Sequence, residues 1–403
     1  MLRPFRGSHQ PLVARHMPEL DVVRGAAVLM VVHCHLLAEY PGGSLWLRNE
    51  DEVVSALFRA VVATASPLGW LGVQLFFVLS GFLITGILLD TRTQPCFYSK
   101  FYARRAVRIL PAYLLCVLIL VVLGWSNLGF PAWNAGQVIC CLGFAANLMT
   151  LFGLVSPYGP LWSLAVEEHF YLLWPMVVRN SGRALGAICV TVVAAEIGLR
   201  WLSRSAYPSA DLSTLTWFNL DGLVMGAVAG LLLRKCHDSA RRLFTFAFCL
   251  STLAVGSLVL LQSRGQLPRA TFGGGVFGPT TWSLLFAACI LFAVLARSRW
   301  PVLWVSRWPF GLLRWFGFIS YGLYLIHVMI IQLADHLLGG VIYPAELASH
   351  GVGDVVTRYG VIVAVASVVS YLSRVCYEQF FLSRKVLVEG WFSKWFGRRN
   401  ATV

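Results

Sequence analysis

Apolar segments of about 20 residues recur along this chain and decide what it can fold into, because a helix of that length crosses the hydrocarbon core of a bilayer. Of its 403 residues, 58% are hydrophobic and only 12% are charged. A soluble domain needs more polar surface than this composition supplies. The sequence therefore predicts an all-α, polytopic integral membrane protein, a bundle of helices embedded in lipid.

We expect about ten membrane helices, with arginine-rich segments between them on the cytoplasmic side, as the positive-inside rule requires. The runs that predict them are 20–39, 69–89, 112–124, 137–154, 164–178, 184–202, 216–233, 243–261, 280–296, 312–333 and 355–382.

The region 137–178 decides the topology. If both of its apolar runs crossed the bilayer, the arginine-rich segments 234–242 and 297–314 would lie outside. One re-entrant or partly buried segment within 137–178 keeps them inside, together with both termini. The irregular stretch VSPYGPLWS between the two runs must then line a cavity or be covered by protein.

We expect a single membrane domain at residues 20–385, between two polar terminal segments. Residues 1–19 form a basic arm and residues 386–403 a basic tail, both predicted to be cytoplasmic, with the domain in the cell inner membrane. The net charge of +14 is explained by basic loops, and no nucleic-acid-binding signature accompanies it. The 10 cysteines form no CxxC pair, so we expect them to pack and not to bind metal.

The first apolar run, LDVVRGAAVLMVVHCH, contains ionisable side chains, which are costly in lipid and are therefore functional candidates. Arg24 and His35 are 11 residues apart, about three helical turns and roughly 16 Å along one face. His33 points away from the helix face that Arg24 and His35 share. An imidazole titrates near neutrality and can take a proton from a hydroxyl. The alternative for His35 is a structural hydrogen bond to a neighbouring helix.

A basic segment, FYARRAVRILPAY, follows the second helix and contains Arg104, Arg105 and Arg108. Arg104 and Arg108 are i,i+4 neighbours on a helix and can form a clamp for phosphate groups. All three can equally anchor the chain at the membrane surface. We expect the next helix to start or kink at Pro111.

Two further polar motifs lie within apolar runs. In GPLWSLAVEEHFYLLWP, Ser163, Glu167 and Tyr171 recur at every fourth position and share one helix face. The carboxylate can orient an imidazole or accept a bond from a substrate hydroxyl, or it can be a polar helix start at the interface. In ISYGLYLIHV, His327 is either a second functional histidine or a packed structural one.

Taken together and in this order, these motifs resemble the membrane acyltransferase 3 family. LDVVRGAAVLMVVHCH matches its pattern of an arginine, ten residues and a histidine. GVQLFFVLSGFLIT, RRAVRILPAY, LWSLAVEEHFYLLWP and ISYGLYLIH resemble its later motifs, so the resemblance covers residues 20–385. It implies an enzyme, a membrane-bound O-acyltransferase that moves an acyl group, usually acetyl, from cytoplasmic acyl-CoA to a hydroxyl of a carbohydrate or glycosylated acceptor.

The resemblance also implies roles for single residues. His35 would be the base, Glu167 its polar partner in catalysis, and Arg104 and Arg105, with Arg108, would bind acetyl-CoA. Supporting or substrate-binding positions would be Arg24, Ser163, Tyr171 and His327. We expect no metal and no permanently bound cofactor. The partners would be acyl-CoA, an acceptor such as a surface polysaccharide, and the lipid bilayer. Direct transfer and an acyl-enzyme relay are both compatible with the sequence.

Two positions depart from the family's pattern. Asn219 stands where the family has an arginine two residues before Asp221, so we expect an arginine–aspartate pair to be missing. Glu378-Gln379-Phe380 lacks the proline of a Glu-x-Pro motif. A transporter or flippase of a lipid-linked sugar is the alternative function, because it would share about ten helices and buried polar residues. A scaffold in an envelope complex is a third, but it would need no buried ionisable residues.

Overall fold

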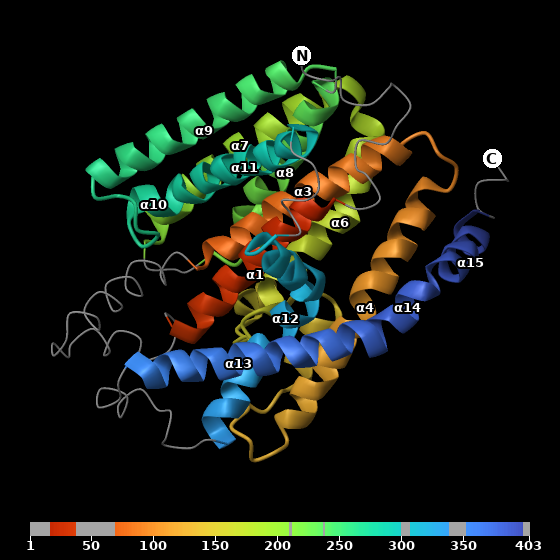
Figure 1. Ribbon diagram of the computed structural model, residues 1–403, viewed down its shortest axis with the longest axis vertical. Helices are drawn as coiled ribbons and strands as arrows, with labels where there is room; N and C mark the ends of the chain where they lie inside the picture. The colour runs from red at the N-terminus through yellow and green to blue at the C-terminus, as the bar shows by residue number, and fades with distance from the viewer. Residues whose placement is uncertain are drawn as a thin grey trace. The chain divides into compact units, whose positions relative to one another are not determined.

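The computed structural model describes residues 17–37, 69–208, 212–236, 238–299, 307–337 and 352–397 (Figure 1). Within these ranges the chain is helical, without a β-strand, which confirms the predicted fold class. It divides into two compact units, each described here by itself. Unit 1 comprises Met1–Arg24, Val73–Phe97 and Trp162–Trp315, and unit 2 comprises Gly25–Gly72, Tyr98–Leu161 and Phe316–Val403.

Most of the long helices follow the predicted apolar runs, with exceptions at 112–124 and 137–154. The long ones are α1 (Pro18–Leu37), α3 (Leu71–Thr91), α4 (Phe97–Leu123), α6 (Leu161–Ser181), α7 (Leu185–Ala206), α8 (Leu220–Lys235), α9 (Ala240–Ser263), α11 (Gly278–Arg299), α12 (Phe310–Leu337), α13 (Val352–Leu372) and α15 (Lys385–Gly397). The short ones are α5 (Ala135–Leu142), α10 (Phe272–Val276) and α14 (Gln379–Ser383), with 3-10 turns at Ala146–Phe152, Gly182–Ala184 and Thr216–Phe218.

Seven helical segments of the described chain are long and apolar enough to cross a membrane. The predicted count of about ten crossings is therefore not confirmed. One of the seven, Leu161–Ala206, has 46 residues and contains both α6 and α7. A continuous helix of that length would measure roughly 69 Å, about twice the hydrocarbon thickness. Gly182, at φ +54°, separates its two halves.

The first part of region 137–178 forms no spanning helix. Helix α5 has 8 residues and the following 3-10 turn has 7, whereas α6 has 21. A crossing needs about 20. The expectation of one non-spanning segment in this region is thus confirmed by the helix lengths.

No helix starts at Pro111, so that alternative is wrong, whereas a kink there stays a prediction. Helix α4 already begins at Phe97 and continues through Pro111, so the arginine segment forms its first turns. Proline removes one helical N–H, here the one that would bond to the Val107 carbonyl. Two hydroxyls of unit 2 bond to α4 beside this residue: the Tyr321 hydroxyl donates to the Ile109 carbonyl at 2.9 Å, and the Tyr377 hydroxyl to that of Pro111 at 3.3 Å.

In unit 1, α11 packs against both α8 and α9, and α7 packs against α8; Figure 1 shows α9 alongside α11. Helix α3 approaches α8 at backbone contact. A Cβ added to Gly81 would lie 1.8 Å from the Leu223 carbonyl oxygen, and one on Gly226 would lie 1.9 Å from that of Val78. Glycine is therefore required at this crossing, where the two backbones approach closely.

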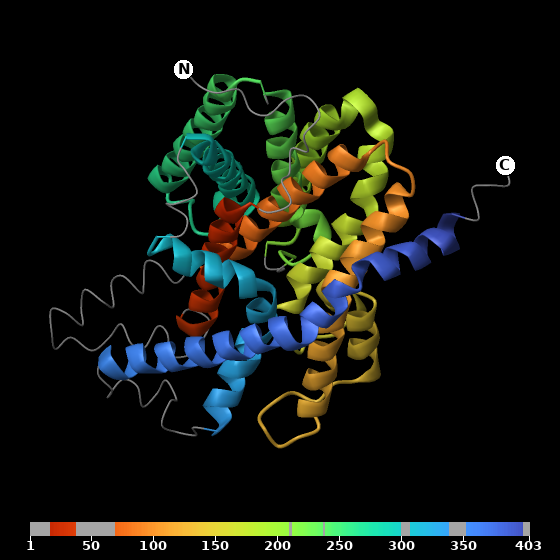
Figure 2. The ribbon, with the colours of Figure 1, turned by 45° about the vertical axis from the view of Figure 1, so that its right-hand side comes forward.

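The last predicted run continues as one helical segment. In unit 2, α13 leads through a π-helical turn, Ser373–Glu378, into α14 and α15 (Figure 2). Phe380, in the place of the expected proline, keeps its backbone N–H and allows the helix to continue. Part of the predicted tail is thus helical, whereas residues 1–16 of the predicted arm and 398–403 of the tail lie outside the described ranges.

A buried ion-pair network joins four helices of unit 1. Asp221, at the start of α8, is 0% exposed. The Arg200 guanidinium of α7 lies 2.6 Å from its Oδ2 and 2.9 Å from Glu196 Oε1. The Thr280 hydroxyl donates to the same Asp221 oxygen at 2.7 Å, and the Gln74 amide to the other at 3.3 Å.

The expectation that Asp221 lacks an arginine partner is therefore wrong. The guanidinium that pairs with Asp221 is that of Arg200 on α7, and not that of a residue two positions before Asp221. Asn219 instead donates to the carbonyls of Ser213 and Leu215 at 2.7 and 2.9 Å and holds the turn before α8.

Replacing Arg200 tests whether this network holds unit 1 together. Arg200→Met removes the one cation between two buried carboxylates, and breaking a buried pair in this way costs about 3–5 kcal/mol. Arg234→Met is the control, since Arg234 pairs with Asp90 at 3.2 Å while its side chain is 47% exposed, and exposed pairs contribute about 1 kcal/mol or less. Thermal unfolding in detergent should show a large loss for Arg200→Met alone. Equal shifts would contradict the structural role.

Candidate functional site

The structure brings the two predicted intramembrane histidines together in unit 2. His35 on α1 and His327 on α12 have ring centroids 5.0 Å apart, with the rings tilted by 51°. His35 is half-buried, whereas His327 is fully buried. His33 contacts Tyr359 on α13 instead, at 5.9 Å between centroids. The two histidines of α1 therefore contact different helices, as their spacing predicts.

His327 is held by its own helix in one tautomer. Its Nδ1 lies 3.1 Å from the Leu323 carbonyl oxygen and 2.8 Å from that of Tyr324. Carbonyl oxygens only accept hydrogen bonds, so Nδ1 must carry the proton and donate. In a neutral ring Nε2 is then a bare acceptor. This atom is buried and has no hydrogen-bond partner among the described residues.

Tyr158 fixes the backbone of α12 around His327. Its hydroxyl donates to the Leu325 carbonyl at 2.7 Å and accepts from the Met329 amide at 3.2 Å. In a regular helix these two backbone groups bond to each other, and a hydroxyl placed at both alters the helix locally. Tyr158 is 2% exposed. The sequence reasoning missed it, although a tyrosine between Pro157 and Gly159 in an apolar region was a signal.

The irregular stretch before α6 is covered by protein only in part: Tyr158 and Pro160 are buried, whereas Val155 is 78% exposed. Besides Tyr158, the Tyr324 hydroxyl of α12 donates to the Pro160 carbonyl at 3.3 Å. The stretch therefore supports the helix that presents His327.

Glu167 forms a second polar centre, on α6 in unit 1. The Tyr171 hydroxyl donates to its Oε2 at 2.5 Å and the Ser80 hydroxyl of α3 to its Oε1 at 3.1 Å. The shared face predicted for Glu167 and Tyr171 is confirmed. Ser163, one turn earlier on α6, is buried. Both oxygens of the half-buried carboxylate are oriented, so it can present its remaining lone pairs to a hydroxyl.

The histidine pair and the Glu167 centre belong to different units and are described separately. The catalytic partnership of His35 with Glu167 therefore stays a prediction. Arg24, near the other end of α1, forms an ion pair with Asp21 on its own helix. Its supporting role also stays a prediction.

The three arginines predicted to bind phosphate lie in the first turns of α4. Arg104 makes a two-point contact with Glu389 of α15: Nε lies 2.7 Å from Oε1 and Nη2 3.1 Å from Oε2. The Arg105 guanidinium lies 5.9 Å from the Phe101 ring centroid, and Arg108 is exposed. Carboxylate and phosphate oxygens take the same guanidinium fork. The sequence reasoning did not foresee Glu389.

The Arg104 end of this pair is open to solvent, because its side chain is 53% exposed, whereas that of Glu389 is 15% exposed. A phosphate group can therefore reach the guanidinium from solvent and compete with the Glu389 carboxylate.

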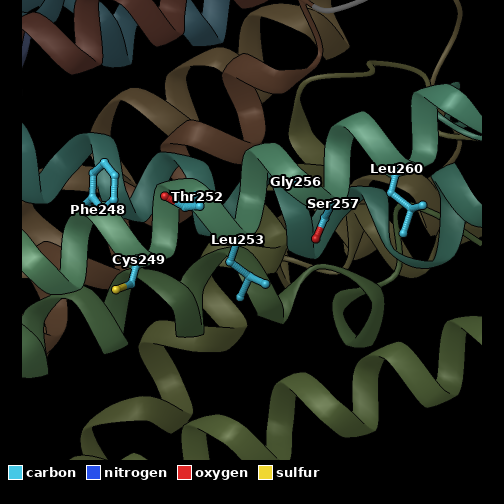
Figure 3. A pocket seen from close by; sticks show the side chains of 7 residues that line it. All are labelled: Phe248, Cys249, Thr252, Leu253, Gly256, Ser257 and Leu260. Atoms are coloured by element: carbon cyan, nitrogen blue, oxygen red, sulfur yellow. The ribbon is translucent and has the colours of Figure 1, made fainter.

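A hollow along α9 is not a candidate site. Its seven lining residues all lie on that one helix and are mostly apolar (Figure 3): Phe248, Cys249, Thr252, Leu253, Gly256, Ser257 and Leu260. An open apolar face on a long membrane helix fits lipid contact. Within the described residues, no group of three or more His, Cys, Asp or Glu side chains could hold a metal ion.

Comparison with known proteins supplies the deciding observation. A family model described as an acyltransferase domain matches residues 17–375. The chain belongs to the acyltransferase 3 family. The match includes both histidines, the α4 arginines and Glu167, and together with the apolar helices it supports a multi-pass membrane protein.

Named relatives of this chain are O-acetyltransferases. The peptidoglycan O-acetyltransferase OatA of Listeria monocytogenes is 27% identical over 354 residues, which is 80% of this chain and 51% of that protein. YrhL of Bacillus subtilis, named provisionally as a peptidoglycan O-acetyltransferase, is 27% identical over 81% of this chain and 50% of its own length. The O-acetyltransferase OatA of Staphylococcus aureus is 32% identical over 44% of this chain and 27% of its own length.

This chain spans about half the length of the first two of these relatives. The comparison with solved structures found no match.

Proposed function

We propose that this chain is a membrane-bound O-acetyltransferase, which transfers an acetyl group from acetyl-CoA to a hydroxyl of a surface polysaccharide. The observation that carries the proposal is the half-buried His35 on α1 in contact with His327, within a chain of the acyltransferase 3 family. The names of its relatives make a peptidoglycan-type glycan the first acceptor to test.

His35 acts as the general base in this proposal. It takes the proton of the acceptor hydroxyl while the oxygen attacks the thioester carbonyl. The carbon–sulfur bond then breaks, and the imidazolium returns the proton to the CoA thiolate, so that one ester and one free thiol are formed. Transfer in two steps through an acyl-enzyme uses the same donor and acceptor.

The arginines of α4 bind the donor. Acetyl-CoA carries several phosphate charges, and Arg104, Arg105 and Arg108 lie within a little over one turn of one another, about two to three turns from the start of α4. By the positive-inside rule this end of the helix and both termini face the cytoplasm, where acyl-CoA is made. Use of a cytoplasmic donor fits a protein of the inner membrane. Glu167 binds and orients the acceptor hydroxyl, with Ser163 and Tyr171 beside it on α6.

The two histidines of α1 provide the test of the base. Loss of a positioned base typically lowers the rate by about 10²–10⁴-fold. His35→Ala should therefore abolish acetyl ester formation at normal membrane levels, whereas His33→Ala, on the face toward Tyr359, should keep most of it. Mass spectrometry of surface glycans from cells that carry each variant measures the acetyl mass. An active His35→Ala protein would remove His35 from this role.

Arg104 and Glu389 provide the test of the donor site. Arg104→Lys keeps the charge but loses the two-point fork, so acetyl-CoA should bind more weakly. Glu389→Gln releases the fork from its carboxylate, so acetyl-CoA should bind more tightly. Isothermal titration of the purified proteins with acetyl-CoA measures both affinities. If both variants instead bind it like the wild type and only unfold more easily, the pair is a structural clamp and the donor lies elsewhere.

A further inference from the structure

The bare Nε2 of His327 is one of several buried polar atoms of the described residues that have no hydrogen-bond partner, and its ring is the one in contact with His35. The side chain is 0% exposed, and Nε2 has no hydrogen-bond partner among the described residues. Leaving such an acceptor unbonded in a low-dielectric interior costs about 1–3 kcal/mol. A histidine that served only to pack α12 would lower the stability of the fold by this amount, with no interaction of Nε2 to offset the loss.

The tautomer of His327 cannot easily be exchanged to remove that cost. Moving the proton to Nε2 would turn Nδ1 into an acceptor facing two carbonyl oxygens, those of Leu323 and Tyr324. A deprotonated Nδ1 would be repelled by both carbonyl oxygens, because all three groups are acceptors, so the ring stays protonated at Nδ1. Tyr158, bonded to the Leu325 carbonyl and the Met329 amide, holds the helix on both sides of the ring.

The neighbour of this ring is His35. Its ring centroid lies 5.0 Å from that of His327, a separation at which nitrogens on facing edges of two imidazoles reach hydrogen-bond distance after a small rotation. A neutral His35 has one N–H donor, and a protonated His35 has two.

We propose that His327 is a positioning residue, whose bare Nε2 accepts a hydrogen bond from the ring N–H of His35 that faces away from the acceptor. This inference rests on the proposed function of His35 as the base. The bond leaves the other nitrogen of His35 unprotonated and aimed at the acceptor hydroxyl.

The same bond supports the charged intermediate. After His35 takes the hydroxyl proton, one of its two N–H groups faces the departing thiolate and the other needs an acceptor within the protein. Nε2 of His327 supplies it without taking the proton, because its own Nδ1–H stays bonded to the two carbonyls. The transferred proton moves only from hydroxyl to His35 to thiolate.

Two amide substitutions separate this role from packing. In His327→Asn the side-chain amide nitrogen takes the place of Nδ1 and keeps a donor for the Leu323 and Tyr324 carbonyls, but no acceptor occupies the place of Nε2. In His327→Gln the longer amide places an acceptor oxygen near the place of Nε2. The full-length proteins are reconstituted in proteoliposomes, with acetyl-CoA and a soluble glycan fragment, and kcat and KM are measured for each.

His327→Asn should lower kcat by about 10-fold or more with little change in either KM, because a base held in the wrong tautomer loses rate and not binding. His327→Gln should recover a substantial part of that loss. Equal activity of the Asn variant and the wild type, equal loss in both variants, or a change confined to KM would overturn the proposal.

The outcomes for His35 keep the two proposals distinct. If the wild-type chain forms no acetyl ester, the proposed function fails. If the wild type is active and His35→Ala is not, while His327→Asn keeps the wild-type kcat, then the role of His327 alone fails.

Discussion

The absence of water from lipid is the constraint on which the rest of this structure depends. Every polar group within the membrane must find its partner in the protein. Asp221 and Glu196 share one guanidinium, that of Arg200. The Leu325 carbonyl and the Met329 amide bond to the Tyr158 hydroxyl. Nε2 of His327 is one of the buried atoms that have no such partner, and it belongs to the ring that contacts His35.

The histidine pair follows from that constraint. Two backbone carbonyls fix the proton of His327 on Nδ1 and leave Nε2 bare beside the ring of His35. A half-buried imidazole next to a fixed acceptor has the arrangement that a general base needs, since its tautomer is set by a neighbour and its second nitrogen stays available. In the role that we propose for His35, the fold of unit 2 would prepare it for proton transfer before any substrate binds.

Part of the fold and of the candidate site could be predicted from the helical periodicity of the sequence. The length of α1, the opposite directions of His33 and His35, and the shared face of Glu167 and Tyr171 all follow from helical spacing. Contacts between distant segments could not be predicted in this way. Arg200 reaches Asp221 from another helix, Glu389 meets Arg104 across 285 positions, and hydroxyls from α12 and the π-helical turn before α14 bond to carbonyls of α4 beside Pro111. No local sequence pattern predicts such partners, because they are determined by tertiary packing.

The stoichiometry of donor and acceptor tests the central claim most directly. Wild-type protein in proteoliposomes, given acetyl-CoA and a glycan acceptor, should release one free CoA thiol for each acetyl ester formed, with both products absent when either substrate is omitted. A transporter or flippase of a lipid-linked sugar would move the glycan across the bilayer and consume no thioester. Movement of the glycan without release of CoA would contradict the account.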